Sequence, residues 1–201
     1  MTPFTTLTAV AAPLDLANID TDKILPARFL RKPRDPGYDP WLFHDMRFDG
    51  EGRERPEFVL NQPPYRKAQI LVAGPNFGCG SSREGAVYAL ADAGFRCVIA
   101  PSFGDIHYAN EIQNGMLPAI VSEETGARLR ELLHKQPGAQ LTIDLAAQTI
   151  AAPDGTNCQF DIEPMYKERL LKGLDDVGMV LQHLPEIEAY ERRRKAEMPW
   201  L

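Results

Sequence analysis

The sequence has few cysteines, no long apolar run and no excess of basic charge. Its three cysteines, Cys79, Cys97 and Cys158, lie far apart and lack C-x-x-C spacing, which argues against a disulfide framework and against a metal or iron–sulfur site held by this chain alone. No segment approaches the roughly 20 apolar residues of a membrane span, and the N-terminus lacks the pattern of a signal peptide. We therefore expect a cytoplasmic chain in a reducing compartment, without a membrane partner.

The charge balance excludes another class of partner. The formal net charge is −6, whereas general nucleic-acid binding needs a basic surface. With 201 residues, 44% of them apolar and 25% charged, the chain is long enough for one well-buried domain and short for two. A local basic pocket for a small anion remains compatible with this composition.

Hydrophobic periodicity predicts a single mixed α/β or α+β domain. Its order is strands, then β-α-β-α-β, then an antiparallel hairpin, then helices, and the first strand is expected to end at Pro13. The predicted strands cover residues 4–12, 68–73, 96–100, 117–121, 140–144, 149–152 and 157–161. The predicted helices run from the glycine-rich segment described below to Gly94, over 105–113 and 123–135, and around 165–172 and 185–197.

Residues 31–66 differ in composition from the rest of the chain. They are rich in charge and in proline, namely Pro33, Pro36, Pro40, Pro56, Pro63 and Pro64. We predict a long irregular loop with one helical turn near 41–43. Loops of this length are usually functional or mobile, so a lid or a docking surface is expected, and a disordered insertion is the alternative.

The segment 74–85 is a glycine-rich loop that runs into a helix. Ser81 lies three residues before Glu84, which is the pattern of a capping box. Gly78 and Gly80 allow a ligand to approach the backbone, and a helix start offers N–H groups and a positive dipole end, to which Arg83 adds a full charge. The segment therefore predicts an anion site with serine hydroxyls beside it, although such serines are more often simple helix caps.

Several motifs with established chemistry are absent from this segment. It lacks the Gly-Lys-Ser/Thr end of a P-loop, the third glycine of a dinucleotide fingerprint and the G-x-S-x-G of a nucleophile elbow. Cys79 has no histidine close in sequence and is better interpreted as a small packed side chain than as a nucleophile. His107 is the only one of the four histidines that lies near the central motifs.

Four segments in a fixed order and spacing carry a family resemblance. They are Asn-Ile-Asp-Thr-Asp-Lys-Ile-Leu-Pro at 18–26, Asn-Phe-Gly-Cys-Gly-Ser-Ser-Arg-Glu at 76–84, Ile-Ala-Pro-Ser-Phe at 99–103 and Asn-Gly-Met-Leu-Pro at 114–118. From about residue 7 to residue 190 the chain resembles the small subunits of bacterial 3-isopropylmalate dehydratases, members of the aconitase superfamily.

The resemblance implies a fold, a partner and a reaction. The fold is a single swivelling β/β/α domain over 1–201, like the mobile C-terminal domain of aconitase, with a helical extension at about 163–201. The partner is a large subunit that carries a four-iron four-sulfur cluster, with no cofactor on this chain. The reaction isomerises 2-isopropylmalate and 3-isopropylmalate, a dicarboxylic acid substrate, by dehydration and rehydration in leucine biosynthesis.

The resemblance also implies roles for individual residues. Ser81 is implied as the catalytic base, an alkoxide held by donors at the helix start. The residues implied to bind substrate are Ser82, Arg83, Asp22 and one arginine of the pair Arg28 and Arg31, with Gly78 and Gly80 as the backbone anion site.

One position departs from the family pattern. The family usually reads Ser-Ser-Arg-Glu-His-Ala, and this chain has Gly85 in place of the histidine. The departure leaves open a related small subunit that acts on another alkyl-substituted malate or dicarboxylate. A separate alternative is a non-catalytic dicarboxylate-binding module that uses the same helix start.

Overall fold

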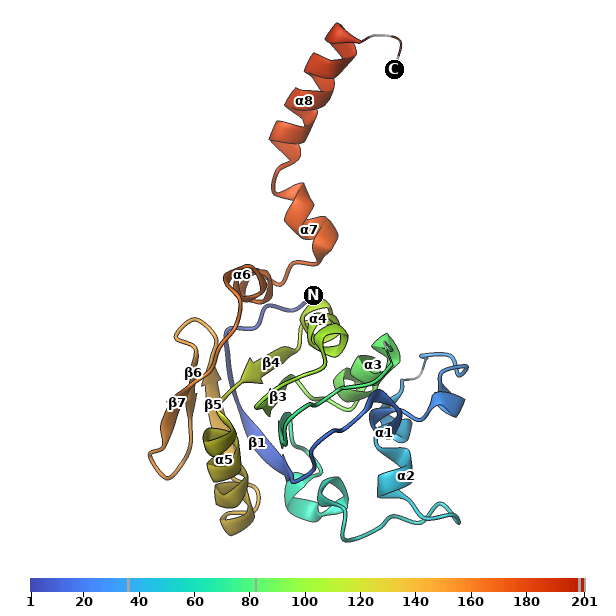
Figure 1. Cartoon of the computed structure of the whole chain (residues 1–201), viewed down its shortest axis with the longest axis vertical. Helices are drawn as coiled ribbons and strands as arrows, with labels where there is room; N and C mark the ends of the chain where they lie inside the picture. Colours follow the sequence, from blue (N-terminus) through green and yellow to red (C-terminus); the bar gives the residue numbers. More distant parts are fainter. Residues whose placement is uncertain (36, 82, 199, 201) are drawn as a thin grey trace.

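A single seven-stranded sheet organises the molecule, in a computed structural model that describes residues 1–35, 37–81, 83–198 and 200 (Figure 1). The strand order is β4-β3-β2-β1-β5-β6-β7. Helices pack on both faces, so the predicted α/β class is confirmed. None of the helices within the described ranges is long and apolar enough to cross a membrane.

Four parallel strands form one half of the sheet. They are β1 (Thr6–Leu14), β2 (Ile70–Ala73), β3 (Cys97–Ala100) and β4 (Leu117–Ile120). Every residue of β2 and β3 is buried, as expected for strands covered on both faces, and this explains their continuous apolar runs. Parallel strands place their carboxyl ends at the same edge, so the loops that follow β1, β2 and β3 meet there.

An antiparallel meander forms the other half of the sheet. β5 (Gln140–Asp144) pairs with the first part of β1, and β6 (Thr149–Ala151) and β7 (Asn157–Gln159) follow in order. These strands confirm the predicted hairpin, although β6 and β7 are shorter than predicted.

The expected end of the first strand at Pro13 is wrong, because β1 continues to Leu14. Residues 6–10 pair with β5, and residues 11–14 pair with β2. Pro13 therefore lies beyond the end of β5, where its missing N–H leaves no ladder partner unsatisfied. The strand can pass through the proline because one of its edges is free at that point.

The predicted helices are present, and those on the body of the molecule pack in two hydrophobic clusters that the sheet separates. α3 (Glu84–Asp92) packs in one cluster, and α5 (Glu123–Lys135), which begins at the capping residue Ser122, packs in the cluster on the other face. α4 (Asp105–Gln113) contacts β4, α3 and α6 (Pro164–Lys172). Leu71 and Ala73 face the α3 cluster, whereas Ile70 and Val72 face the α5 cluster, as alternation in a strand requires.

The segment 31–66 is more regular than the loop predicted for it. It holds α2 (His44–Arg47) and three short 3-10 helices, Asp39–Trp41, Val59–Asn61 and Pro63–Tyr65. Its buried apolar side chains belong to the α3 cluster, namely Tyr38, Leu42, Phe43, Leu60 and Tyr65. The disordered-insertion alternative is therefore wrong for the described residues, because the segment supplies part of the core.

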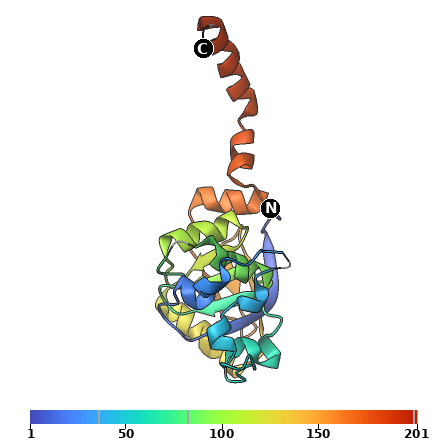
Figure 2. The ribbon, with the colours of Figure 1, turned by 90° about the vertical axis from the view of Figure 1, so that its right-hand side faces the viewer.

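The C-terminal helices leave the body of the molecule. After α6 the chain forms α7 (Asp176–Leu181), which the sequence did not predict, and α8 (Leu184–Glu197). Figures 1 and 2 show both helices projecting away from the sheet. The predicted extension therefore begins with one helix packed on the body and ends with two that project from it.

Candidate functional site

The two motifs singled out in the sequence, near residues 18–26 and 76–84, lie side by side. The N–H of Gly78 donates to the carbonyl of Ile19 at 2.7 Å, and the N–H of Thr21 donates to the carbonyl of Cys79 at 3.0 Å. The N–H of Phe77 bonds to the carbonyl of Ser102 at 3.0 Å. The loops after β1, β2 and β3 are thus joined by backbone hydrogen bonds at the carboxyl edge of the sheet, where open α/β sheets commonly bind ligands.

The two glycines of the loop serve different purposes. Both have positive φ, +69° at Gly78 and +92° at Gly80, which favours glycine. A Cβ atom at Gly78 would lie 2.1 Å from Cγ of His107, so the loop rests directly on that ring. Because the N–H of Gly78 is already bonded to Ile19, the predicted anion-donor role of Gly78 does not hold in this structure, and that of Gly80 stays a prediction.

The predicted capping box is wrong. α3 begins at Glu84 with Arg83 as its N-cap residue, in extended conformation, so Ser81 stands two residues before the cap. The Glu84 carboxylate instead accepts a hydrogen bond from Nδ2 of Asn114 at 3.1 Å. Ser81 is exposed, and its carbonyl accepts from Oγ1 of Thr21 at 2.9 Å. The serine side chain is therefore not consumed as the cap of α3.

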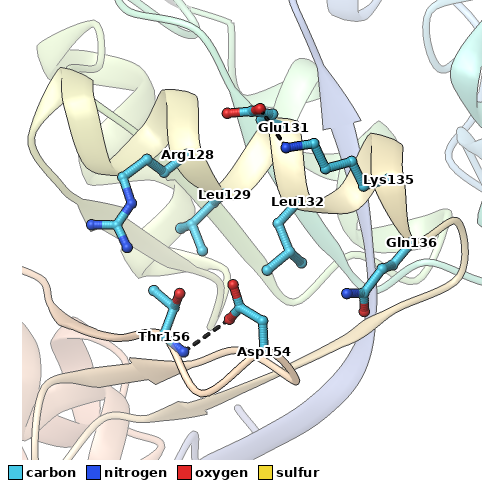
Figure 3. A pocket seen from close by; sticks show the side chains of 8 residues that line it. All are labelled: Arg128, Leu129, Glu131, Leu132, Lys135, Gln136, Asp154 and Thr156. Carbon is cyan, nitrogen blue, oxygen red and sulfur yellow. Dashed lines mark hydrogen bonds and ion pairs between the residues drawn. The ribbon is translucent and has the colours of Figure 1, made fainter.

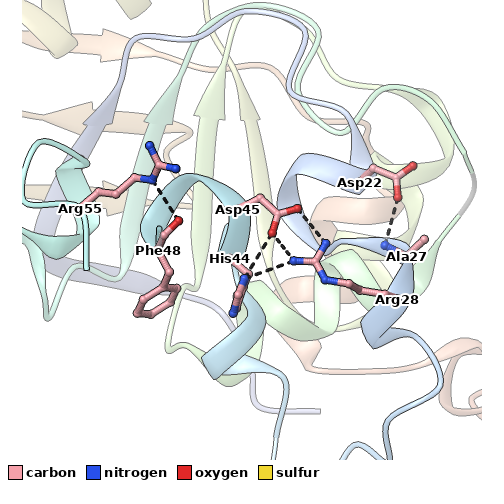
Figure 4. Close-up of polar contacts among 7 residues, drawn as sticks. All are labelled: Asp22, Ala27, Arg28, His44, Asp45, Phe48 and Arg55. Atoms are coloured by element: carbon pink, nitrogen blue, oxygen red, sulfur yellow. Dashed lines mark hydrogen bonds and ion pairs between the residues drawn. The ribbon is translucent and has the colours of Figure 1, made fainter. Parts of the chain in front are cut away.

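Asp22 and Arg83, predicted from separate motifs, form an ion pair. Asp22 belongs to α1 (Thr21–Ile24), whose N-cap is Asp20, and its Oδ1 also accepts from the N–H of Ala27 at 3.1 Å (Figure 4). The Arg83 side chain is 21% exposed and that of Asp22 is 55% exposed. A half-buried guanidinium that is paired with one carboxylate keeps further N–H donors, with which it can bind a second carboxylate.

The two candidate arginines near residue 30 have different surroundings. Arg28 binds both carboxylate oxygens of Asp45, with His44 beside them (Figure 4). Hydrogen bonding to Arg28 is the main reason that the pKa of Asp45 falls to about 2. Arg31 is exposed and forms no ion pair with any residue in the described ranges. The guanidinium of Arg28 is thus engaged by Asp45, whereas that of Arg31 is available to bind a substrate carboxylate.

Gly85, the residue that departs from the family pattern, lies beneath two leucine side chains. A Cβ atom there would stand 2.9 Å from Cδ2 of Leu30 and 3.1 Å from Cδ2 of Leu25. The glycine allows the segment that carries Arg28 and Arg31 to pack directly on α3. A larger residue at this position would push Leu30 away from the helix.

The remaining candidates are placed as follows. Ser82 lies outside the described residues, so its role in substrate binding stays a prediction. Within the described ranges, no three His, Cys, Asp or Glu side chains are grouped as metal ligands require. The groove of about 180 Å³ between α5 and the β6–β7 turn contains none of the candidate residues (Figure 3).

Two residues that matter locally were not singled out from the sequence. Thr21 is 2% exposed and ties the carbonyl of Ser81 to α1, and Asp45 holds Arg28. The sequence shows Thr21 only as a threonine between two aspartates, and its burial is known from the structure alone. Nothing in the sequence marks Asp45, because its contact depends on how the segment 31–66 folds back.

Comparisons with known proteins identify the family of the chain. The family model described as the aconitase C-terminal domain matches residues 1–124, one described as LeuD_N matches 127–164, and one described as the C-terminal domain of the 3-isopropylmalate dehydratase small subunit matches 176–201. The 3-isopropylmalate dehydratase small subunit of Rhodospirillum centenum is 51% identical over 100% of this chain and 98% of its own length. That of Azorhizobium caulinodans is 50% identical over the whole of both chains.

A solved structure gives the same result for the fold. The 3-isopropylmalate dehydratase (LeuD) crystal structure from Methanocaldococcus jannaschii superposes with a TM-score of 0.63 at 26% identity, covering 92% of this chain and 99% of that one. Identity of about half over full length, with the aconitase-type domain match, is well beyond a likeness of fold alone. The chain belongs to the family of 3-isopropylmalate dehydratase small subunits.

Proposed function

We propose that this chain is the small subunit of a two-chain hydro-lyase that isomerises 2-isopropylmalate and 3-isopropylmalate in the cytoplasm, as a step of leucine biosynthesis. The observation that carries the proposal is the joining of Asp22, Ser81 and Arg83 at one edge of the sheet in a member of this family. We further propose that residues 1–201 act as one swivelling unit against a large subunit.

The reaction requires a base on one side of the substrate and a Lewis acid on the other. Dehydration removes a weakly acidic proton from a carbon beside a carboxylate, while a hydroxide leaves the neighbouring carbon; rehydration reverses this with the positions exchanged. Ser81, exposed and free of the α3 cap, is the proposed base. The cluster proposed for the large subunit supplies Lewis acidity to the leaving hydroxide.

On this chain, Arg83 and the residues beside it are proposed to bind the substrate. The guanidinium of Arg83 is oriented by Asp22 and suits bidentate binding of a substrate carboxylate. Ser82 and the N–H of Gly80 are proposed to add hydrogen bonds. The site is open on this chain, so the large subunit is required to close it and exclude water.

The test of this function is reconstitution. The chain mixed with a cluster-loaded large subunit is expected to isomerise 2-isopropylmalate, and neither chain alone should do so. A panel of alkyl-substituted malates tests the alternative raised by Gly85: higher kcat/KM on another acid would contradict the isopropylmalate assignment. Micromolar calorimetric binding of a dicarboxylate to the isolated chain, with no turnover in the mixture, would favour a non-catalytic binding module instead.

Arg31, rather than Arg28, is expected to contact the substrate. Arg31→Ala should raise KM by about 10- to 100-fold, the loss expected for a hydrogen bond between charged groups. Arg28→Ala removes the contact with Asp45 and should affect stability more than KM. Steady-state kinetics and thermal denaturation of both variants decide between them, and a larger KM effect for Arg28→Ala would reverse the assignment.

A further inference from the structure

A buried ionisable pair lies beneath the glycine-rich loop. His107 and Glu111 stand one turn apart on α4, with side chains 1% and 0% exposed, and Nε2 lies 3.0 Å from Oε1. Glu111 is the only acidic residue that is buried in the described part of the chain. The proposed reaction assigns no role to either residue, although His107 lies directly against the segment that carries Ser81.

His107 is the direct support of that segment. Its ring would overlap a Cβ atom at Gly78, at 2.1 Å from Cγ and 2.2 Å from Cδ2. The ring also meets the ring of Phe77 edge to face, with centroids 5.4 Å apart. The loop therefore rests on an imidazole three residues before Ser81, and a shift or tilt of this ring changes the position of the loop.

Glu111 is the polar group within reach of that ring. The Nε2–Oε1 contact of 3.0 Å is the closest polar contact of the pair, and Nδ1 of His107 and Oε2 of Glu111 have no hydrogen-bond partner among the described residues. Cys97 faces Glu111 from β3, and Tyr108 lies beside it on α4, with Tyr166 and Glu163 of the α6 region facing Tyr108. None of these groups supplies a positive charge to Glu111.

Burying His107 and Glu111 together costs folding free energy, which makes a purely structural role for the pair unexpected. Burial raises the pKa of Glu111, and His107 opposes that rise. Two buried polar groups with incomplete hydrogen bonding are usually less stable than apolar residues of the same size. A pair kept at such a cost directly under a reactive loop points to a role in the geometry of the loop.

We propose that His107 and Glu111 are a positioning pair: Glu111 fixes the imidazole against Gly78, and the ring fixes the Gly78–Ser81 loop, so that the pair governs turnover without touching substrate. The kinetic part of this inference rests on the proposed function. A misplacement of about 1 Å can cost on the order of 100-fold in rate, whereas Arg83 and Asp22, outside this contact, keep the substrate bound.

The first test is kinetic and uses the reconstituted complex. Glu111→Leu removes the partner of the ring and is expected to lower kcat by about 10- to 100-fold with little change in KM. Glu111→Gln keeps an acceptor oxygen and should restore most of kcat. Leu129→Ala, a buried position on α5, is the matched control, which lowers Tm and leaves kcat unchanged.

The second test does not depend on activity. Hydrogen exchange of the amides of residues 77–80 in the full chain should become faster in Glu111→Leu and stay unchanged in Leu129→Ala. Unchanged exchange in Glu111→Leu, or a lowered Tm with unchanged kcat, overturns the positioning role. An inactive wild-type complex would contradict the proposed function, while faster exchange in Glu111→Leu would still support the positioning pair.

Discussion

Replacement of Ser81 by alanine is expected to lower kcat of the reconstituted complex by about a thousandfold or more, with a normal fold. A general base contributes about 10²–10⁴-fold, and this serine is the proposed acceptor of the substrate proton. Its side chain is exposed and does not cap α3, so its loss removes no structural hydrogen bond of that helix. Steady-state kinetics and thermal denaturation of the variant measure the two effects separately.

A matched control exists for this variant in the cap of α5. Ser122 accepts the N–H of Thr125 at 3.1 Å, so Ser122→Ala should cost about 1 kcal/mol of stability and leave kcat unchanged. Ser81→Ala should show the opposite pattern. Near-normal kcat in Ser81→Ala would remove this residue from the role of base, and a raised KM alone would assign it to substrate binding.

Local signals in the sequence were sufficient for most of the fold. The strands at 70–73 and 97–100 are continuous apolar runs because both faces of the sheet are covered, and α5 has an amphipathic spacing with a serine cap. Such signals depend on residues that are close together in the chain, so they can be interpreted without knowledge of the tertiary structure. The short helices α1, α2 and α7 are the exceptions among the α-helices of the described residues, because they have too few turns to show a period.

The site could be predicted only in part. Asp22 and Arg83 were identified by family resemblance, but their contact depends on the pairing of β1 with β2, which brings residues 61 apart in sequence together. The capping box failed for a related reason. Gly80 turns the chain through positive φ, and Ser81 is held by Thr21 of another motif, so the helix begins later than the local pattern indicates.

Substitution of Gly78 by alanine is expected to destabilise the fold strongly. The position has φ of +69°, and the added Cβ would stand 2.1 Å from the ring of His107. Roughly 1 kcal/mol for the backbone and 1–3 kcal/mol for overpacking suggest a total of about 2–4 kcal/mol. For a chain of this size that lowers Tm by about 5–15 °C, measured by thermal denaturation.

Gly155 provides the control that separates the two costs. It also has positive φ, +87°, but a Cβ atom there would meet nothing within 4 Å, so Gly155→Ala should show the backbone cost alone. The difference between the two variants then measures the contact with His107. Adding His107→Ala to Gly78→Ala should recover part of the lost stability, because the smaller side chain vacates the space that the new methyl group needs. Equal effects of Gly78→Ala and Gly155→Ala would contradict the close approach of loop and ring, since both variants would then report only the backbone.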